Sequence, residues 1–405
     1  MRSFAYRALD NKRQEIRLLT VHAGSGRDTV RGSIRHVSLS RQRGLDYETV
    51  SYCWEDQRLR WYVVVNGRLL DVPASAEKAL RRLRHKKRDR VLWIDSICNN
   101  QKDTRERSQQ VGLMCDIYSG STLNLVWLGE GDDSIPQALM AIDTVLGSMR
   151  QETSDMRELV TFIYGKDRSH DCLYSTTGIV GEIDWQPLLD FFARPWFRRL
   201  WVLQEAALAS SSLCHCGDQT VDLVDILRVA LWIMHKGQHT PFGVGANPGI
   251  MAATHMHAYV DREYGQFHAS IPESGYGFSL GYHLSITTLF RTSDPRDVVF
   301  AILGLPRDKL YEAHPPLLVP DYEKPAGLVL RDATRAAIEE YRSLDVMHML
   351  CHREQSATST AHSDNTTPSW VPAWTRAYDM YEDSNGLAPF FRADGDSAVS
   401  PFRYS

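Results

Sequence analysis

One glutamate stands alone among apolar side chains near the middle of the chain. Glu205 is the single charge in residues 200–209, within a segment, 194–209, that has a proline near its start and is expected to form one helix. A carboxylate on such a helix is costly to ionise unless it is paired, so Glu205 should have a raised pKa, meet Arg198 or Arg199, or face a cleft. The sequence therefore indicates Glu205 as a catalytic carboxylate, with a structural ion pair as the open alternative.

Polar and aromatic side chains also lie at the ends of two expected strands. Ser51, Tyr52 and Trp54 end the aromatic and β-branched run 47–54, and Asp95 ends a short continuous apolar run. Ligands of open α/β sheets bind where the carboxyl ends of the strands meet. We interpret these four residues as candidate substrate-binding positions. The alternatives are core packing and turn formation for the first group, and a turn-forming role for Asp95.

Three other patterns give weaker indications of chemistry. Cys214 and Cys216 flank His215, but a strand would send the histidine to the opposite face, and no second cluster completes a metal site. The glycine-rich stretch 243–249 has no strand before it, so we expect a loop and not a phosphate cradle. Seven of the ten residues 81–90 are Arg or Lys, which indicates a solvated helix end, with a phosphate or acidic-partner patch as the alternative.

Composition limits the class of protein. The chain has 405 residues, 43% of them hydrophobic, and 46 basic against 50 acidic residues give a net charge of −4. This is a globular composition with no overall attraction to nucleic acid or anionic membranes. Seven cysteines without regular spacing indicate free thiols in a reducing compartment, and no segment is long and apolar enough to span a bilayer. We therefore expect a cytoplasmic protein with no nucleic-acid partner, no membrane span and no metal.

The elements that must position these residues alternate between strand and helix. Buried strands are expected at 91–95 and 123–129, and between them Asp103 and Glu106 have the spacing of an N-cap and its third helical residue. Strand, helix and strand at this spacing are typical of a βαβ unit, which predicts an α/β fold with a mostly parallel sheet flanked by helices.

Further elements surround this unit. The remaining expectations are strands at 15–21 and 34–39, a hairpin of 61–65 and 68–72 around Asn66-Gly67, a helix capped by Ser75, a helix at 136–149, a polar insertion at 151–177, a strand at 213–216, and helices at 221–235, 294–305 and 326–341. Residues 237–281 give little periodic signal, and 354–367 are expected to form a flexible loop.

Five segments, in order, resemble the HET (heterokaryon incompatibility) domain of filamentous fungi. The matching pieces are residues 47–54, 92–101, 106–118, 126–129 and 194–205. Glu55 stands where the family usually has glycine, and Asn99 replaces an apolar residue. The resemblance implies N-terminal strands packing on the core at 1–45, a HET domain at 46–210 with a rim insertion near 151–177, and a mainly helical C-terminal region at 211–405.

The HET domain resembles, at a distance, the TIR fold, which implies a TIR-like or flavodoxin-like sheet. In many TIR enzymes a helix with Trp, three residues and Glu supplies the glutamate that cleaves NAD⁺, and Trp201 and Glu205 have that spacing. The resemblance therefore implies Glu205 as the catalytic residue of an NAD⁺ glycohydrolase, with Trp201 beside the substrate and Trp54 able to stack on a base or nicotinamide ring. NAD⁺ would be the substrate, with no further cofactor.

Two functions remain open at this stage. The resemblance implies a cell-death effector that responds to fusion of genetically unlike hyphae, and this effector could consume NAD⁺. The alternative is a non-enzymatic signalling or scaffold module of the same fold that binds a partner protein or a nucleotide. Either function would need a partner protein or self-association for activation.

Overall fold

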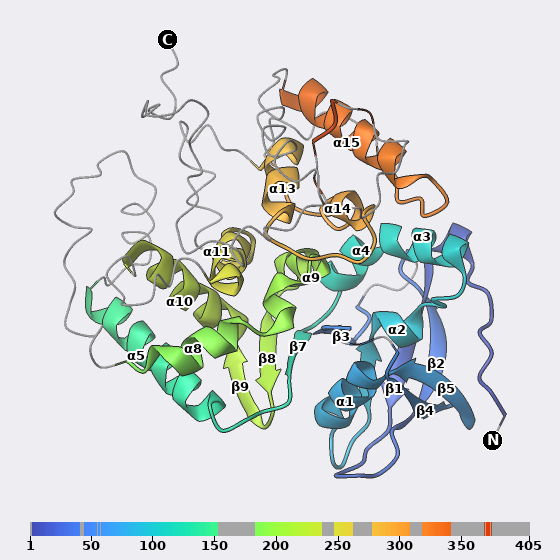
Figure 1. Cartoon of the computed structure of the whole chain (residues 1–405). Coiled ribbons are helices and arrows are strands. Elements are labelled where there is room, and N and C mark those ends of the chain that lie inside the picture. The colour runs from blue at the N-terminus through green and yellow to red at the C-terminus, as the bar shows by residue number, and fades with distance from the viewer. Residues whose placement is uncertain are drawn as a thin grey trace.

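The structure is a computed structural model of the whole chain (Figure 1). It describes residues 2–40, 44–54, 56, 58–152, 183–236, 247–261, 278–307, 318–341, 368, 370–372 and 374. The expected insertion at 151–177, the glycine-rich stretch at 243–246, the expected loop at 354–367 and Glu55 lie outside the described residues, apart from residues 151 and 152.

Within the described residues, nine strands form one sheet. They are β1 (Glu15–Val21), β2 (Arg31–Ser38), β3 (Glu48–Tyr52), β4 (Arg60–Val65), β5 (Arg68–Pro73), β6 (Arg90–Trp93), β7 (Asn124–Gly129), β8 (Ser212–Cys216) and β9 (Gln219–Asp222), in the spatial order β5-β4-β2-β1-β6-β3-β7-β8-β9. The four strands β6-β3-β7-β8 are parallel to one another, and antiparallel pairs continue the sheet on both sides.

The parallel centre has the strand order that the fold prediction requires. In chain order β3 is its first strand and β6, β7 and β8 follow, so the spatial order is 2-1-3-4, the order of the first four strands of a flavodoxin-like sheet. The order reverses at β3, between β6 and β7. Doubly wound folds of this kind bind ligands at the carboxyl ends of the strands beside that reversal. The predicted α/β class is confirmed.

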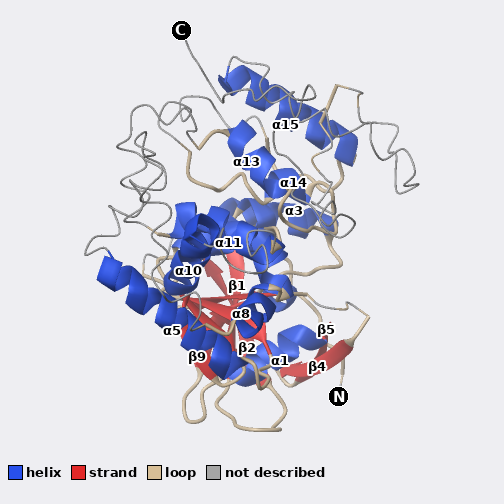
Figure 2. Cartoon of the chain, turned by 60° about the vertical axis from the view of Figure 1, so that its left-hand side comes forward, coloured by secondary structure: helices blue, strands red, loops and turns tan. Residues whose placement is uncertain are grey.

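The helices flank this sheet. The elements are η1 (Asn11–Arg13), α1 (Ala74–Leu83), α2 (Asp95–Cys98), α3 (Thr104–Gly112), α4 (Met114–Ser119), α5 (Ile135–Glu152), α8 (Trp185–Phe192), η3 (Pro195–Arg198), α9 (Trp201–Leu208), α10 (Leu223–Lys236), α11 (Pro248–Val260), α13 (Leu280–Thr287), α14 (Asp297–Phe300) and α15 (Ala326–Tyr341). Helices α8 and α10 lie on the side of β8 and β9, and α1 lies beside the β4–β5 hairpin (Figure 1). In the turned view the strands lie beneath α8 and α10 (Figure 2).

Two separate hydrophobic cores are formed by different parts of the sheet and its helices. One core is built from β1 to β7 with α1, α2 and α4, and the other from α5 and all later helices together with β7 and β8. The side chain of Trp201 packs against both cores. Helices α13, α14 and α15 gather beyond α3, α4 and α9, at the end of the molecule opposite the β4–β5 hairpin (Figure 1). The segment at α9 therefore lies where the two halves of the chain meet.

Local signals predicted several elements correctly. The hairpin turns at Asn66 and Gly67, whose φ angles of 50° and 72° are the left-handed angles that such a turn requires. Asp103 caps α3 by accepting from the backbone N–H of Glu106 at 3.0 Å. The prediction for Ser75 was wrong, because α1 starts one residue earlier and Pro73 is its N-cap, without a side-chain hydrogen bond.

Two other predictions need larger corrections. The segment expected as one helix is divided into the short 3₁₀ turn η3 and the helix α9, because Arg199 is extended, with φ −74° and ψ 129°. Helix α11 lies in the region that gave little periodic signal. Eight of its residues are buried, so it has no polar stripe to set a period, although Asn247 caps it as the sequence rules allow.

Candidate functional site

Four of the predicted site residues come together at the carboxyl ends of the two central strands. Ser51 and Tyr52 are the last two residues of β3, and Trp54 follows in the loop. Asp95 begins helix α2, two residues after β6 ends. Since β3 and β6 are parallel neighbours, their ends meet at one edge of the sheet. This edge is the place that the strand order favours for a ligand.

Glu205 reaches this edge from helix α9. Its Oε2 atom accepts a hydrogen bond from the hydroxyl of Ser51, and its Oε1 atom accepts one from Nη1 of Arg199 at 3.1 Å. The Ser51 hydroxyl in turn accepts from the indole N–H of Trp196 at 2.9 Å. The side chain of Glu205 is only 3% exposed. Of the environments expected for Glu205, the structure therefore shows the arginine partner and the raised pKa, and the carboxyl group does not face a cleft.

Arg199 joins the two carboxylates of the site. Its Nη1 atom also donates to the carbonyl oxygen of Tyr52 at 2.8 Å, and its Nη2 atom lies 3.5 Å from Oδ2 of Asp95. Burial alone would lower the pKa of Arg199, but the charges of Glu205 and Asp95 outweigh burial and raise it. The guanidinium is therefore a permanent cation shared between two acids.

Asp95 and Trp54 form the more open part of the site. The indole N–H of Trp54 donates to Oδ2 of Asp95 at 3.1 Å, and the backbone N–H of Ser96 donates to Oδ1 at 2.7 Å. Burial raises the pKa of Asp95, and Arg199 lowers it in part. The side chains of Asp95 and Arg199 are 18% and 17% exposed, far more than that of Glu205. A ligand approaching this edge would meet these two charges and the Trp54 ring first.

The surroundings of Glu205 shift its pKa toward neutral pH. Burial raises its pKa to about 7, against the opposing effects of the Arg199 charge and the Ser51 hydrogen bond. The charge of Asp95 raises it further, and the buried hydroxyls of Tyr52 and Tyr118 lie within electrostatic reach. A carboxyl group in this state exchanges its proton close to pH 7, which is the behaviour of an acid–base group.

Trp201 lies apart from the cluster. It starts helix α9, and its side chain lies close enough to Asp297 of the C-terminal region to lower the pKa of that carboxyl group. Sequence reasoning gave no role to Trp196, which orients Ser51, or to Gln101, whose amide donates to the Asp95 carbonyl at 2.9 Å. Both residues lie inside the HET-like segments, but only spatial contact assigns them to the site.

The weaker candidates have other surroundings. Three residues of the basic run, Arg81, Arg82 and Arg84, donate to backbone carbonyls of other segments and tie helix α1 to its neighbours. Residues 86–89 are exposed, as expected for a solvated helix end. In the His215 segment, burial lowers the pKa of the imidazole to about 4. Across the described ranges, no group of three or more His, Cys, Asp or Glu is placed to hold a metal ion.

Comparison with known proteins gives one family. Residues 47–205 match the family described as heterokaryon incompatibility protein (HET). The chain is 26% identical over 420 aligned positions to heterokaryon incompatibility protein 6, OR allele, of Neurospora crassa. The alignment covers 91% of this chain and 58% of that protein, so the chain spans little more than half the length of its relative. No solved structure matches the chain.

The matched range includes most of the site. It begins just before β3 and ends at Glu205, and it contains Ser51, Asp95 and Arg199. No helix among the described residues combines the length and the apolar character needed to cross a membrane. Residues 47–205 are therefore similar to the HET domain, and most of the chain is similar to a heterokaryon incompatibility protein.

Proposed function

We propose that this chain acts in heterokaryon incompatibility, as an effector or signalling component of the death response between genetically unlike hyphae that have fused. The HET domain and the name of the Neurospora crassa relative support this role. Its activation would need a partner protein or self-association.

The finer part of the proposal is cleavage of NAD⁺ at the bond between nicotinamide and ribose. The observation that carries it is the position of Glu205, a buried carboxyl group bound by Ser51 and Arg199 at the edge of the sheet where ligands of this fold bind. Trp54 and Asp95 lie at the open side of the same edge. The distant likeness of HET domains to TIR enzymes supports the same chemistry.

The reaction places specific demands on these residues. The carbon–nitrogen bond breaks with its electron pair passing to nicotinamide, and water then adds to the ribose carbon and releases one proton. Glu205 must be ionised to stabilise the positive charge that develops on the ribose. Because Arg199 and Ser51 occupy both of its oxygens, Arg199 must move before Glu205 contacts substrate. Trp54 would then stack on a ring of the nucleotide.

One observation favours a second candidate function. Glu205 is almost fully buried and paired, as expected for an ion pair that fixes a helix in a binding module. Under this second function, the chain has the same fold and binds a partner protein or a nucleotide beside Asp95, but it catalyses no reaction.

Nicotinamide release separates the two functions. Purified chain is incubated with NAD⁺, and nicotinamide is measured by chromatography for the unmodified protein, Glu205→Gln and the control Glu339→Gln, which changes an exposed glutamate of α15. The enzyme proposal expects Glu205→Gln to lose about 100-fold or more of the activity, with the control unchanged. In cells, NAD⁺ loss and toxicity should disappear together in Glu205→Gln. Unchanged toxicity would reject the enzymatic function.

A further inference from the structure

Arg199 covers Glu205, and a backbone segment from far along the chain holds Arg199 in place. The N–H of Leu200 donates to the carbonyl of Arg291 at 3.0 Å, and the N–H of Arg291 donates to the carbonyl of Arg198 at 2.5 Å. These bonds form an isolated parallel bridge between residues 199 and 291. The backbone on both sides of Arg199 is thus hydrogen-bonded to Arg291 of the C-terminal region. This contact is one reason why the helix is interrupted at Arg199.

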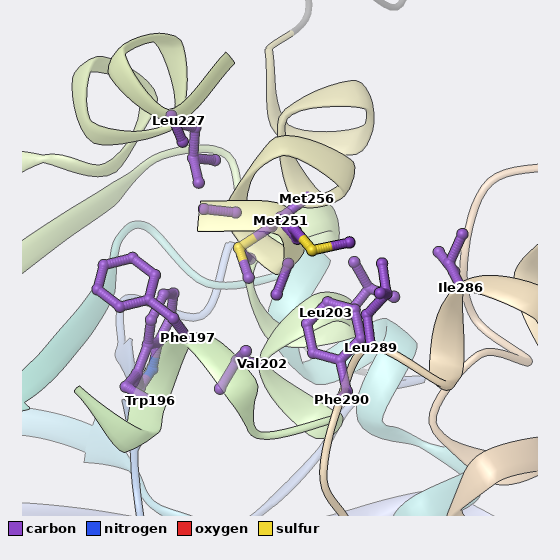
Figure 3. Close-up of a cluster of buried hydrophobic side chains, with 14 of the residues drawn as sticks. Trp196, Phe197, Val202, Leu203, Leu227, Met251, Met256, Ile286, Leu289 and Phe290 are labelled. Carbon is purple, nitrogen blue, oxygen red and sulfur yellow. The ribbon is translucent and has the colours of Figure 1, made fainter. Parts of the chain in front are cut away.

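The same segment is anchored by apolar packing. Leu289 and Phe290, directly before the bridge, are 7% and 3% exposed and belong to the same core as Leu203 of α9. Figure 3 shows these three side chains gathered together, with Met251 and Met256 of α11 close by. The backbone bridge is therefore attached to a packed hydrophobic surface and does not depend on two hydrogen bonds alone.

Asp297 anchors the other end of the segment. It accepts from the hydroxyl of Tyr322 at 2.5 Å and from the hydroxyl of Thr292 at 3.2 Å. The side chain of Trp201, the first residue of α9, lies close enough to lower the pKa of this carboxyl group. One buried carboxyl group thus joins the segment, the loop before α15 and the helix that carries Glu205.

The loop before α15 is in turn fixed to the HET domain. The Arg107 guanidinium of α3 lies 3.7 Å from the centre of the Tyr322 ring, and the backbone N–H of Tyr322 donates to the Ser108 hydroxyl at 3.0 Å. This part of the C-terminal region therefore contacts helices α3 and α9, with Tyr322 and Asp297 between them.

From this geometry we propose that residues 289–297 form a strap that holds Arg199 over Glu205, and that Asp297 is the positioning residue of the strap. When the strap is displaced, the residues on either side of Arg199 lose their backbone partner, Arg199 leaves Glu205, and the carboxylate becomes accessible. A partner that pulls on the C-terminal region would open the site in this way. This regulatory consequence rests on the function proposed above, but the strap itself does not.

The test measures access to Glu205 in the folded full-length chain. Carbodiimide labelling of Glu205 is followed by mass spectrometry, and hydrogen exchange of the Leu200 amide reports the bridge. Asp297→Asn should raise both rates about tenfold, because a buried carboxylate loses hydrogen bonds that hold the strap. The control Asp332→Asn removes a carboxylate of α15 that binds Lys324 and Arg331 and does not contact the strap, so both rates should stay unchanged.

A second pair of variants covers the case in which Asp297→Asn does not fold. Arg291→Pro removes the N–H that donates to Arg198, whereas Arg291→Ala keeps it, so only the proline variant should increase labelling and exchange. Folding is checked by the thermal midpoint. The infrared carboxylate band, assigned with Glu205→Gln, should also titrate at lower pH in the opened variants, because exposure removes the effect of burial.

The outcomes for the strap and for the enzyme are separate. Unchanged labelling and exchange in folded Asp297→Asn and Arg291→Pro would overturn the strap, whatever the result with NAD⁺. Increased labelling without nicotinamide release from any variant would support the strap and reject NAD⁺ cleavage. Increased labelling together with faster nicotinamide release would support both.

Discussion

Two buried arginine–glutamate pairs differ in the number and geometry of the hydrogen bonds that join their side chains. Arg17 of β1 binds Glu106 of α3 with two parallel hydrogen bonds of 2.6 and 2.9 Å, and the same guanidinium donates to the carbonyls of Cys98 and Arg7. Glu106 also accepts from the backbone N–H of Asn100. Two hydrogen bonds join these side chains, and each side chain makes further hydrogen bonds, as expected for an ion pair that stabilises the fold.

The pair of Arg199 and Glu205 is built differently. Only one hydrogen bond of 3.1 Å joins the two side chains, and the arginine is shared with Asp95 and the Tyr52 carbonyl. Burial raises the pKa of Glu205 to about 7 in spite of the cation. The comparison shows that similar burial supports two different uses. Two parallel hydrogen bonds give rigidity, whereas a shared cation leaves a carboxyl group able to change its charge near neutral pH.

The largest expected effect comes from breaking the first pair. Arg17→Met leaves Glu106 buried without its cation, so the free energy of unfolding in urea should fall by about 4 kcal/mol. Arg7→Ala is the control, because Arg7 is 65% exposed and its pair with Glu15 should contribute less than about 1 kcal/mol. If the free energy of unfolding fell by the same small amount in both variants, the buried pair would not be a main contributor to stability.

The second prediction uses pH to separate the pairs. The pKa of Glu205 is about 7 in the folded chain and 4.5 in the reference state, so the folded state binds more protons than the unfolded state between these values. Stability due to this group therefore falls as pH rises from about 4.5 to 7, by about 3 kcal/mol in all. Glu205→Gln cannot titrate, so its stability relative to the unmodified chain should increase by that amount between pH 4 and pH 8.

Urea unfolding at several pH values checks this second prediction. Glu339→Gln, at an exposed pair with Arg335, should follow the unmodified chain at every pH. A constant difference between Glu205→Gln and the unmodified chain across the range would contradict the raised pKa.

The smallest of the three effects is expected from Arg199→Met. It removes the cation from Glu205, but this carboxyl group can take up a proton, so the loss of stability at pH 7 should be about 2 kcal/mol and less than that of Arg17→Met. The pKa of Glu205, measured from its infrared band, should rise further. A fall in the pKa would show that solvent enters the site once Arg199 is gone.

Much of the fold could be predicted because its signals are local. The Asn66-Gly67 turn, the Asp103 cap and the apolar runs of β6 and β7 each depend on a few neighbouring residues. The interruption at Arg199 could not be predicted, since its cause is the backbone of Arg291, 92 positions away by residue number. Helix α11 was missed because it is apolar on most sides, which removes the period that a sequence reading detects.

For the site too, local sequence predicted some features, whereas others depend on contacts between distant segments. The sequence indicated that Glu205 would need a partner, named Arg199 as one possibility, and placed Ser51 and Asp95 at strand ends. It did not indicate that Ser51 donates to Glu205 across 154 positions, that Trp196 orients Ser51, or that Trp201 lies near Asp297. Contacts of this separation depend on how η3 and α9 pack against strand β3 and the C-terminal region, and no local pattern encodes that packing.

The amino-acid sequence by itself determined the alternation of strands and helices, the resemblance to the HET domain, and the isolation of one acidic residue on an apolar helix. These features follow from side-chain type and spacing alone. Only the tertiary structure decided that this acid is covered, which cation it shares, and which distant segment holds that cation in place. Burial and charge pairing depend on distances in space, and chain folding brings together residues that are far apart in sequence.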